Sequence, residues 1–210
     1  MTILHLDASP RRAASLSRQA GEMVVRHLQR LHPGAAVLRR DLGLEPPPYV
    51  DERLARAMLM PAEARGAVER TALALSESLI GELETTDLLV IATPMHNYTV
   101  PAPLKAWLDH VVRIGRSFRS TPAGKVGLLR DRPAMIVTAA GGRHIGEEAR
   151  QPDFLLPYLR AILATIGIRN VRFLSLQGTA RAEQAEARAL ADAAAWIERE
   201  LAPALLPDRS

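Results

Sequence analysis

Three serines and three arginines lie within ten residues near the start of the chain. Ser9, Ser15 and Ser17 supply hydroxyl groups, and the arginines are Arg11, Arg12 and Arg18. Ser15 stands at the N-cap of a run with helical spacing that reaches Leu31. The N-terminus of a helix attracts phosphate because it has unpaired N–H groups and a partial positive charge. We therefore expect this turn to bind a terminal phosphate; the alternative is an ordinary serine-capped helix with solvated arginines.

The loop 94–98 also has side chains suited to a ligand. Met95 is polarizable and can lie against a ring, Asn97 offers both donor and acceptor groups, and Tyr98 can cover a ring edge. Backbone N–H groups of this proline-bounded loop suit the pyrimidine edge of a flavin. The loop therefore favours a flat aromatic ligand, although core packing would also explain Met95 and Tyr98. Gly141-Gly142 would let the backbone approach a ligand closely or form a plain turn.

Strand and helix patterns alternate along the chain. The apolar run 87–93 is too short for a helix and rich in branched residues, which is typical of a strand covered on both faces. The alternation predicts an α/β fold with a parallel sheet and helices on both faces. We expect strands at 3–6, 35–38, 87–93, 134–138 and 171–176, helices at 16–31, 52–60, 65–84, 103–112, 153–166 and 181–201, a long polar excursion at 113–132, and a frayed tail at 203–210.

Three loops follow strands of this sheet. In such folds ligands bind beyond the carboxyl ends of the strands, so residues 9–17, 94–99 and 139–144 are expected to share one edge. The glycine-rich dinucleotide fingerprint and the phosphate-binding loop ending in Gly-Lys-Ser/Thr are both missing after the first strand. A hydroxyl-rich turn in that place suits a single phosphate, which makes flavin mononucleotide (FMN) the natural candidate.

The composition indicates a single domain over residues 1–210. The chain has no cysteine, which excludes disulfides, thiolate catalysis and cysteine-based metal sites and is compatible with a cytoplasmic location. There is no signal-type segment, and no apolar run approaches the ~18 residues that span a bilayer. The net charge of +4 comes mainly from dispersed arginines, so it weakly favours an anionic ligand and argues against nucleic acid. The histidines show no metal-ligand spacing, so no metal is expected.

Several blocks of sequence match one known family in a single register. They are Ser9-Pro10-Arg11 with Ser15-Leu16-Ser17, residues 94–98 with 104–109, residues 115–119 with 127–128, and Gly141-Gly142. Together they resemble the FMN-dependent NADH:quinone oxidoreductase/azoreductase family. The resemblance implies a flavodoxin-like, doubly wound five-stranded sheet in the order 2-1-3-4-5, and a homodimer with FMN at its interface. It also implies ping-pong hydride transfer from NADH or NADPH through FMN to quinones or aromatic azo compounds.

The resemblance also assigns site residues. Phe118 matches an aromatic residue near the substrate that reaches toward the partner subunit, and no side chain is assigned as catalytic with certainty. His96 and His144 are candidate proton donors by position, and an exposed loop histidine is the alternative for each. The residues expected to bind FMN are Ser9, Ser15, Leu16, Ser17, Pro94, Met95, His96, Asn97, Tyr98, Ala139, Ala140, Gly141 and Gly142.

Two of these segments depart from the family pattern. The usual Met-Tyr-Asn-Phe has His96 and Tyr98 at its second and fourth places, which predicts a more polar surface toward the ligand. The usual Ser-Arg-Gly-Gly begins with Ala139 and Ala140, so side-chain bonds from those positions are lost. Two other functions therefore stay open: a flavodoxin-like electron carrier, against which the basic charge argues, and a non-redox flavin-binding regulatory protein.

Overall fold

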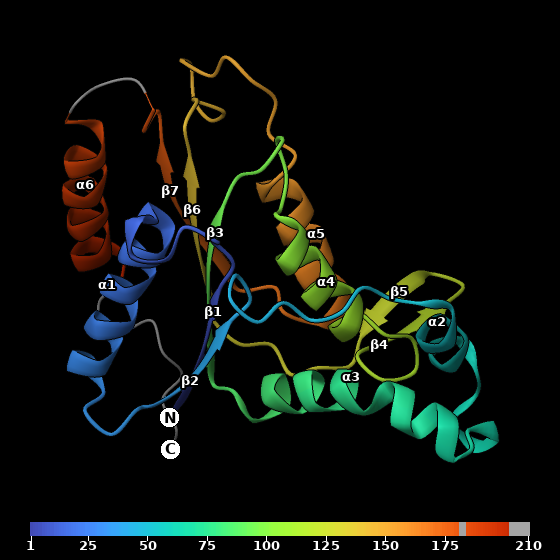
Figure 1. Cartoon of the computed structure of the whole chain (residues 1–210). Coiled ribbons are helices and arrows are strands. Elements are labelled where there is room, and N and C mark those ends of the chain that lie inside the picture. Colours follow the sequence, from blue (N-terminus) through green and yellow to red (C-terminus); the bar gives the residue numbers. More distant parts are fainter. Residues whose placement is uncertain (181–183, 202–210) are drawn as a thin grey trace.

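A five-stranded parallel sheet forms the centre of the molecule (Figure 1). The computed structural model describes residues 1–180 and 184–201. The strands are β1 (Thr2–Asp7), β2 (Ala36–Asp41), β3 (Leu88–Pro94), β6 (Ala134–Ala140) and β7 (Val171–Gln177), in the order β2-β1-β3-β6-β7. Counted along the parallel strands this is 2-1-3-4-5, so the expected flavodoxin-like fold is confirmed. The strand order reverses between β1 and β3, and the loops after these strands flank the crevice where such sheets bind ligands.

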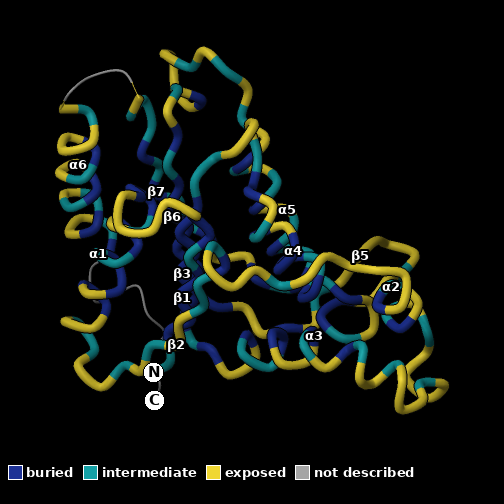
Figure 2. Tube along the Cα trace, viewed as in Figure 1, coloured by how far each residue is buried: buried dark blue, intermediate teal, exposed yellow. Residues whose placement is uncertain are grey.

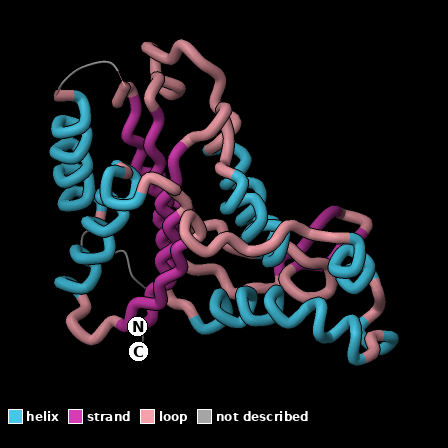
Figure 3. The backbone as a smooth tube through the Cα atoms, in the orientation of Figure 1, coloured by secondary structure: helices cyan, strands magenta, loops and turns pink. Residues whose placement is uncertain are grey.

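Helices cover both faces of the sheet (Figures 1 and 3). α1 (Leu16–Leu31) and α6 (Ala185–Glu200) lie on one face. α3 (Ala67–Thr85), α4 (Ala102–Val111) and α5 (Leu156–Ile166) lie on the other. The short helix α2 (Glu52–Leu59) packs on α3, and two 3-10 turns, η1 (Arg12–Ala14) and η2 (Ala62–Ala64), complete the described elements.

The sheet separates two apolar cores, and Figure 2 shows its strands among the most buried parts of the chain. Alternate residues of β3 contribute to opposite cores: Leu89 and Ile91 face the α3–α4–α5 side, whereas Leu88 and Val90 face the α1–α6 side. A strand covered on both faces needs apolar residues throughout, which explains the continuous apolar run in the sequence.

The second strand is longer than predicted. β2 continues through Arg39 and Arg40 to Asp41, although the prediction ended at Leu38. β2 is an edge strand paired only with β1, and most of its residues are exposed or half-buried. Charged side chains can therefore reach water without leaving the strand. Figure 2 shows the contrast between this edge and the buried central strands.

The 113–132 excursion is more ordered than a loop. It contains an antiparallel hairpin of β4 (Phe118–Thr121) and β5 (Gly124–Gly127). A Cβ on Gly127 would lie 2.2 Å from the backbone nitrogen of Gly167, at the end of α5. Because α5 begins at the carboxyl edge of the sheet and runs back, its end and the hairpin lie toward the amino edge (Figure 1).

The helix boundaries differ from the predictions by small amounts. α5 begins at Leu156, three residues later than expected, because the Asp153 carboxylate accepts hydrogen bonds from the N–H groups of Leu155 and Leu156. The expected start of the last helix at 181–183 and the expected frayed tail at 203–210 lie outside the described residues. Within the described ranges, no helix has the length and apolar character that crossing a bilayer requires.

Candidate functional site

The turn after β1 gathers buried hydroxyl groups at the start of α1. Ser9, Ser15 and Ser17 are each no more than 3% exposed. Ser15 caps the helix by accepting from the N–H of Arg18 at 3.5 Å, and the Ser15 and Ser17 hydroxyl oxygens lie 3.1 Å apart. Within the helix, the N–H groups of Leu16 and Ser17 have no carbonyl partner, since the first turn of any helix lacks them. The serine cap predicted from the sequence is confirmed, and two of the three hydroxyls lie within hydrogen-bond distance of each other.

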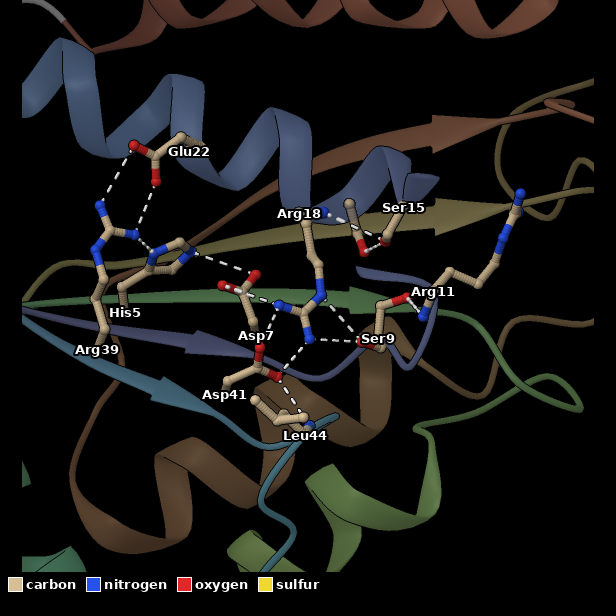
Figure 4. A network of polar contacts seen from close by, with 11 residues as sticks. His5, Asp7, Ser9, Arg11, Ser15, Arg18, Glu22, Arg39, Asp41 and Leu44 are labelled. Atoms are coloured by element: carbon tan, nitrogen blue, oxygen red, sulfur yellow. Dashed lines mark hydrogen bonds and ion pairs between the residues drawn. The ribbon is translucent and has the colours of Figure 1, made fainter. Parts of the chain in front are cut away.

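The three arginines of this turn behave differently. Arg11 and Arg12 are exposed, and in Figure 4 the Arg11 side chain extends away from the network. The Arg18 guanidinium instead points back to Asp41 at the end of β2 and to the carbonyl oxygen of Ser9. Asp41 was not among the predicted site residues. The only signal for it in the sequence is an acidic residue at the end of the second strand.

The loop after β3 forms a tight two-residue turn at the same edge of the sheet. His96 and Thr99 exchange two backbone hydrogen bonds of 2.9 and 3.0 Å. Asn97 and Tyr98 between them have φ values of 48° and 71°, the pattern of a type I′ turn. Non-glycine residues with positive φ store strain of roughly 1–3 kcal/mol each, and such residues cluster at functional sites. His96, Asn97 and Tyr98 are exposed, so this turn presents its side chains to a ligand or to solvent.

The loops after β3 and β6 are joined by direct contacts. The N–H of Met95 donates to the carbonyl of Ala139 at 2.8 Å. The sulfur of Met95 accepts from Nε2 of Gln151 at 3.4 Å, in the loop after β6. Pro94, the last residue of β3, pairs in register with Ala139. The two segments predicted to share one edge of the sheet therefore meet there.

The glycine pair after β6 is held by the protein itself. The carbonyl oxygens of Ala140, Gly141 and Gly142 accept from backbone N–H groups of residues 178–180. A Cβ on Gly142 would lie 2.6 Å from Oε1 of Gln151, so the flexible end of that side chain would have to move to make room for it. Close approach of the backbone to a ligand stays a prediction for these two glycines.

Comparison with known proteins shows which family has this arrangement. The family model described as "Flavodoxin-like fold" matches residues 1–201. "FMN-dependent NADH:quinone oxidoreductase 2" of Cupriavidus pinatubonensis is 50% identical over 194 residues, covering 92% of this chain and 94% of the relative. The chain belongs to the flavodoxin-like family of FMN-dependent NADH:quinone oxidoreductases. The resemblance seen in the sequence is thereby confirmed.

Two further similarities agree with this family. "FMN-dependent NADH:quinone oxidoreductase 4" of Pseudomonas fluorescens is 45% identical over 183 residues, covering 87% of each chain. The crystal structure of the azoreductase AzrA superposes with a TM-score of 0.83 at 25% identity, covering 95% of this chain and all of that one.

His144 is buried, although the alternative to its predicted role as a proton donor was an exposed loop histidine. It is 5% exposed, and both of its ring nitrogens are buried without a hydrogen-bond partner among the described residues. Its backbone N–H donates to Oε1 of Gln177 at 3.0 Å, as does that of Ile145. Burial lowers the pKa of His144, so its imidazole is neutral at neutral pH. A neutral, enclosed ring is a poor proton donor, whereas His96 is exposed at the edge of the sheet.

Phe118 is the one predicted residue that a single chain does not bring to this edge. It lies on β4, 8% exposed, with the Lys125 ammonium 5.2 Å from the centre of its ring. The hairpin that carries it sits toward the amino edge of the sheet (Figure 1). Within one chain, Phe118 therefore lies away from the loops that follow β1, β3 and β6, and its contact with a substrate stays a prediction.

Proposed function

We propose that this protein is an FMN-dependent oxidoreductase that passes electrons from NADH or NADPH to quinones or aromatic azo compounds by a ping-pong sequence. One observation carries the proposal: three buried serines lie around the N-terminus of α1 after β1, and the strained turn 96–99 follows the neighbouring parallel strand β3, at the switch point of the sheet. The names of the relatives, which specify FMN and quinone, agree with this chemistry.

The residues present fit FMN at its phosphate. The hydroxyls of Ser9, Ser15 and Ser17 and the N–H groups of Leu16 and Ser17 offer hydrogen-bond donors without opposing charge. The Ser9 oxygen already accepts from the N–H of Arg11 at 3.3 Å, which leaves its own proton free to donate. Donors at a helix N-terminus suit a dianion, because the helix dipole adds to their attraction.

The flavin ring would lie along the turn after β3 and the segment after β6. FMN, when bound, supplies the two-electron chemistry that links the nicotinamide and the acceptor. The chain's part is to hold and orient the ring and to stabilise negative charge with backbone donors. We assign these contacts to Pro94, Met95, His96, Asn97 and Tyr98, and on the other side to Ala139, Ala140, Gly141 and Gly142.

Proton delivery follows from the contrast between the two histidines. We assign it to water or to His96, which stands exposed in the 96–99 turn. His144 has no role as a donor at neutral pH in this proposal, since burial keeps its ring neutral.

A homodimer belongs to the same proposal. Large apolar side chains are exposed on several segments: Tyr49 is 73%, Leu59 79% and Phe154 60% exposed. Phe154 lies next to the turn after β3, where its N–H donates to the carbonyl of Tyr98 at 3.2 Å. A second copy covering these residues would bury apolar surface and bring a residue such as Phe118 to the site. A cytoplasmic location remains part of the proposal.

The test is a flavin titration followed by an assay. Apoprotein titrated with FMN should develop a bound flavin spectrum and should bind riboflavin more weakly. NADH should then bleach the flavin band, and a 1,4-benzoquinone or an aromatic azo dye should restore it, with parallel lines in double-reciprocal plots. No binding in excess FMN would overturn the proposal. Binding without reduction by NADH or NADPH would favour the electron-carrier or regulatory alternatives.

A further inference from the structure

Arg18 occupies a place where a cation is locally unfavourable. It is in the first turn of α1, which contains no acidic residue. The N-terminus of a helix is the positive end of its dipole, so a positive side chain there is destabilising. The first turn also faces the proposed phosphate, which a free guanidinium would be expected to contact. Neither helix stability nor direct contact with a ligand explains the direction that this side chain takes.

The Arg18 guanidinium hydrogen-bonds to groups of the protein itself (Figure 4). Nη1 donates to Oδ2 of Asp41 at 2.6 Å, and Nη2 donates to Oδ1 of the same carboxylate. Nε and Nη2 also donate to the carbonyl oxygen of Ser9, at 2.9 and 2.6 Å. Its side chain is only 14% exposed, and the Asp7 carboxylate lies 3.7 Å from Nη1. The hydrogen bonds that Arg18 donates to Asp41 raise the pKa of Arg18, as expected for a cation held in a bidentate pair.

This pairing joins three separate segments of the chain. Arg18 belongs to α1, Ser9 to the turn after β1, and Asp41 to the end of β2. Asp41 in turn accepts from the N–H of Leu44 at 3.0 Å, which fixes the turn after β2. The guanidinium therefore ties the ligand-side turn to the edge strand.

Gly43 gives independent evidence of the same close fit. A Cβ at this position would lie 2.3 Å from the carbonyl oxygen of Ser9 and 2.9 Å from Nη2 of Arg18. Its N–H donates to the carbonyl of Asp7 at 3.2 Å. The backbone of the turn after β2 thus packs directly against the hydrogen bonds between Arg18 and the Ser9 carbonyl. Any side chain at position 43 would clash with the Ser9 carbonyl oxygen.

We propose that Arg18, Asp41 and Gly43 are positioning residues for the turn 9–17, called the phosphate turn below. This inference rests on the proposed function. The three residues hold the Ser9 peptide so that its carbonyl oxygen faces the guanidinium and does not oppose the phosphate charge. The Ser9 hydroxyl stays on the ligand side, with its proton free. Arg18 acts through Ser9 and does not touch the phosphate, because Asp41 neutralises its charge.

The decisive experiment compares FMN with riboflavin, which lacks the phosphate. Dissociation constants for both are measured by quenching of flavin fluorescence in Asp41→Asn, Arg18→Gln and Gly43→Ala. We expect FMN binding to weaken by about 10- to 100-fold and riboflavin binding by less than about threefold, as for other residues that orient a ligand contact indirectly. The matched control is Arg26→Gln, an exposed arginine of the same helix paired with Glu22 at 3.2 Å, which should leave both constants unchanged.

Asp41→Asn separates positioning from direct contact. It keeps the shape of the side chain and removes its charge, so it also decides the question if either other variant fails to fold by circular dichroism. If Arg18 contacted the phosphate directly, releasing it from Asp41 would leave FMN binding unchanged or make it stronger, and the proposal would be overturned.

Two further outcomes distinguish this inference from the proposed function. A loss of FMN and riboflavin binding by the same factor would overturn the positioning role and leave the proposed function standing. A wild-type protein that binds FMN no more tightly than riboflavin would remove the phosphate site itself.

Discussion

The two edges of the sheet differ in how far their polar groups are hydrogen-bonded within the protein. At the amino edge, Arg132 is 3% exposed and its guanidinium donates to the carbonyls of Thr86 and Arg130. Beside it, one oxygen of Asp131 accepts from the N–H groups of Arg132, Arg169 and Asn170 at 2.8–3.2 Å. These contacts bind the loops before β3, β6 and β7 to one another.

At the carboxyl edge the same sheet leaves donors for a ligand. The hydroxyls at the start of α1 contact one another and the backbone near them, and the first-turn N–H groups have no carbonyl within the helix. The turn 96–99 holds two strained residues, whereas the amino-edge residues Thr86, Arg130, Asp131 and Arg132 all have negative φ. The amino edge is satisfied internally and serves stability. The carboxyl edge holds two residues with positive φ and helix N–H groups that lack a carbonyl partner within the helix, which agrees with the binding role proposed for it.

The largest effect is expected at the phosphate turn. Ser15→Asp with Ser17→Asp should weaken FMN binding by more than about 100-fold, because two added negative charges oppose the phosphate. Fluorescence titration measures the constant. Ser78→Asp adds the same type of charge on an exposed part of α3 and should change nothing. Ser17→Ala, a smaller change, should still weaken FMN binding. Normal affinity in both serine variants would place the phosphate elsewhere.

At the amino edge the expected effect is on stability alone. Arg132→Met should lower the free energy of unfolding by about 2–3 kcal/mol, since it removes the 2.7 Å donor from the buried carbonyl of Thr86, which keeps only a 3.5 Å contact from Arg130, and both side-chain donors from the part-buried carbonyl of Arg130. FMN affinity of the folded variant should be unchanged. Urea denaturation and flavin titration measure the two quantities. Arg130→Gln removes a cation that is 58% exposed and should cost less than about 1 kcal/mol. A fall in the FMN affinity of Arg132→Met would contradict the claim that the amino edge affects stability alone.

The carboxyl group of Asp7, at the carboxyl edge, makes the stability of the protein depend on pH. Burial raises the pKa of Asp7 from 3.8 to about 6, against the attraction of Arg18. Because the folded-state pKa is above that of the unfolded chain, the stability from this group is fully present below about pH 4 and is lost as the pH rises through 6. Asp7→Asn should therefore stabilise the apoprotein by about 2 kcal/mol near pH 7.5 and by almost nothing near pH 4.

Urea denaturation at the two pH values measures that difference. Asp109→Asn, which removes an exposed carboxylate paired with Lys105, serves as the control and should show no such pH-dependent gain. A gain from Asp7→Asn that is equal at both pH values would show that the buried charge is not its cause.

The smallest effect concerns the strained turn. Tyr98→Gly creates Asn-Gly, the pair that type I′ turns prefer, and should stabilise the apoprotein by about 1 kcal/mol. Turnover with quinones should fall, because the exposed ring beside the site is lost. Thermal unfolding and the NADH assay measure the two changes. Asn97→Ala should destabilise the turn, because alanine adopts a positive φ less readily than asparagine does. A destabilised Tyr98→Gly variant would mean that this turn holds no strain.

Much of this architecture was readable from local patterns. The apolar run at 87–93 predicted a strand buried on both faces, and β3 is that strand. Ser15 predicted the start of α1, because N-capping depends on residues only three apart. The family blocks predicted the strand order, which no local pattern contains.

Other features escaped prediction because they depend on partners far along the chain. The strands of the hairpin 118–127 are only four residues each and include two glycines, which gives a weak strand signal, and packing against the end of α5 positions the hairpin. The roles of Asp41 and Gly43 needed the turn after β2 to meet the turn after β1, which lies more than 30 residues away.

The sequence by itself determined the parallel α/β fold, the serine cap at the start of α1 and the family, since periodicity, caps and motifs are local properties. Only the tertiary structure decided that Arg18 faces Asp41 and not the ligand side, that His144 is enclosed, and that Phe118 lies away from the site of its own chain. The physical reason is that a side chain's direction and charge state depend on which distant groups surround it, and folding alone brings those groups together.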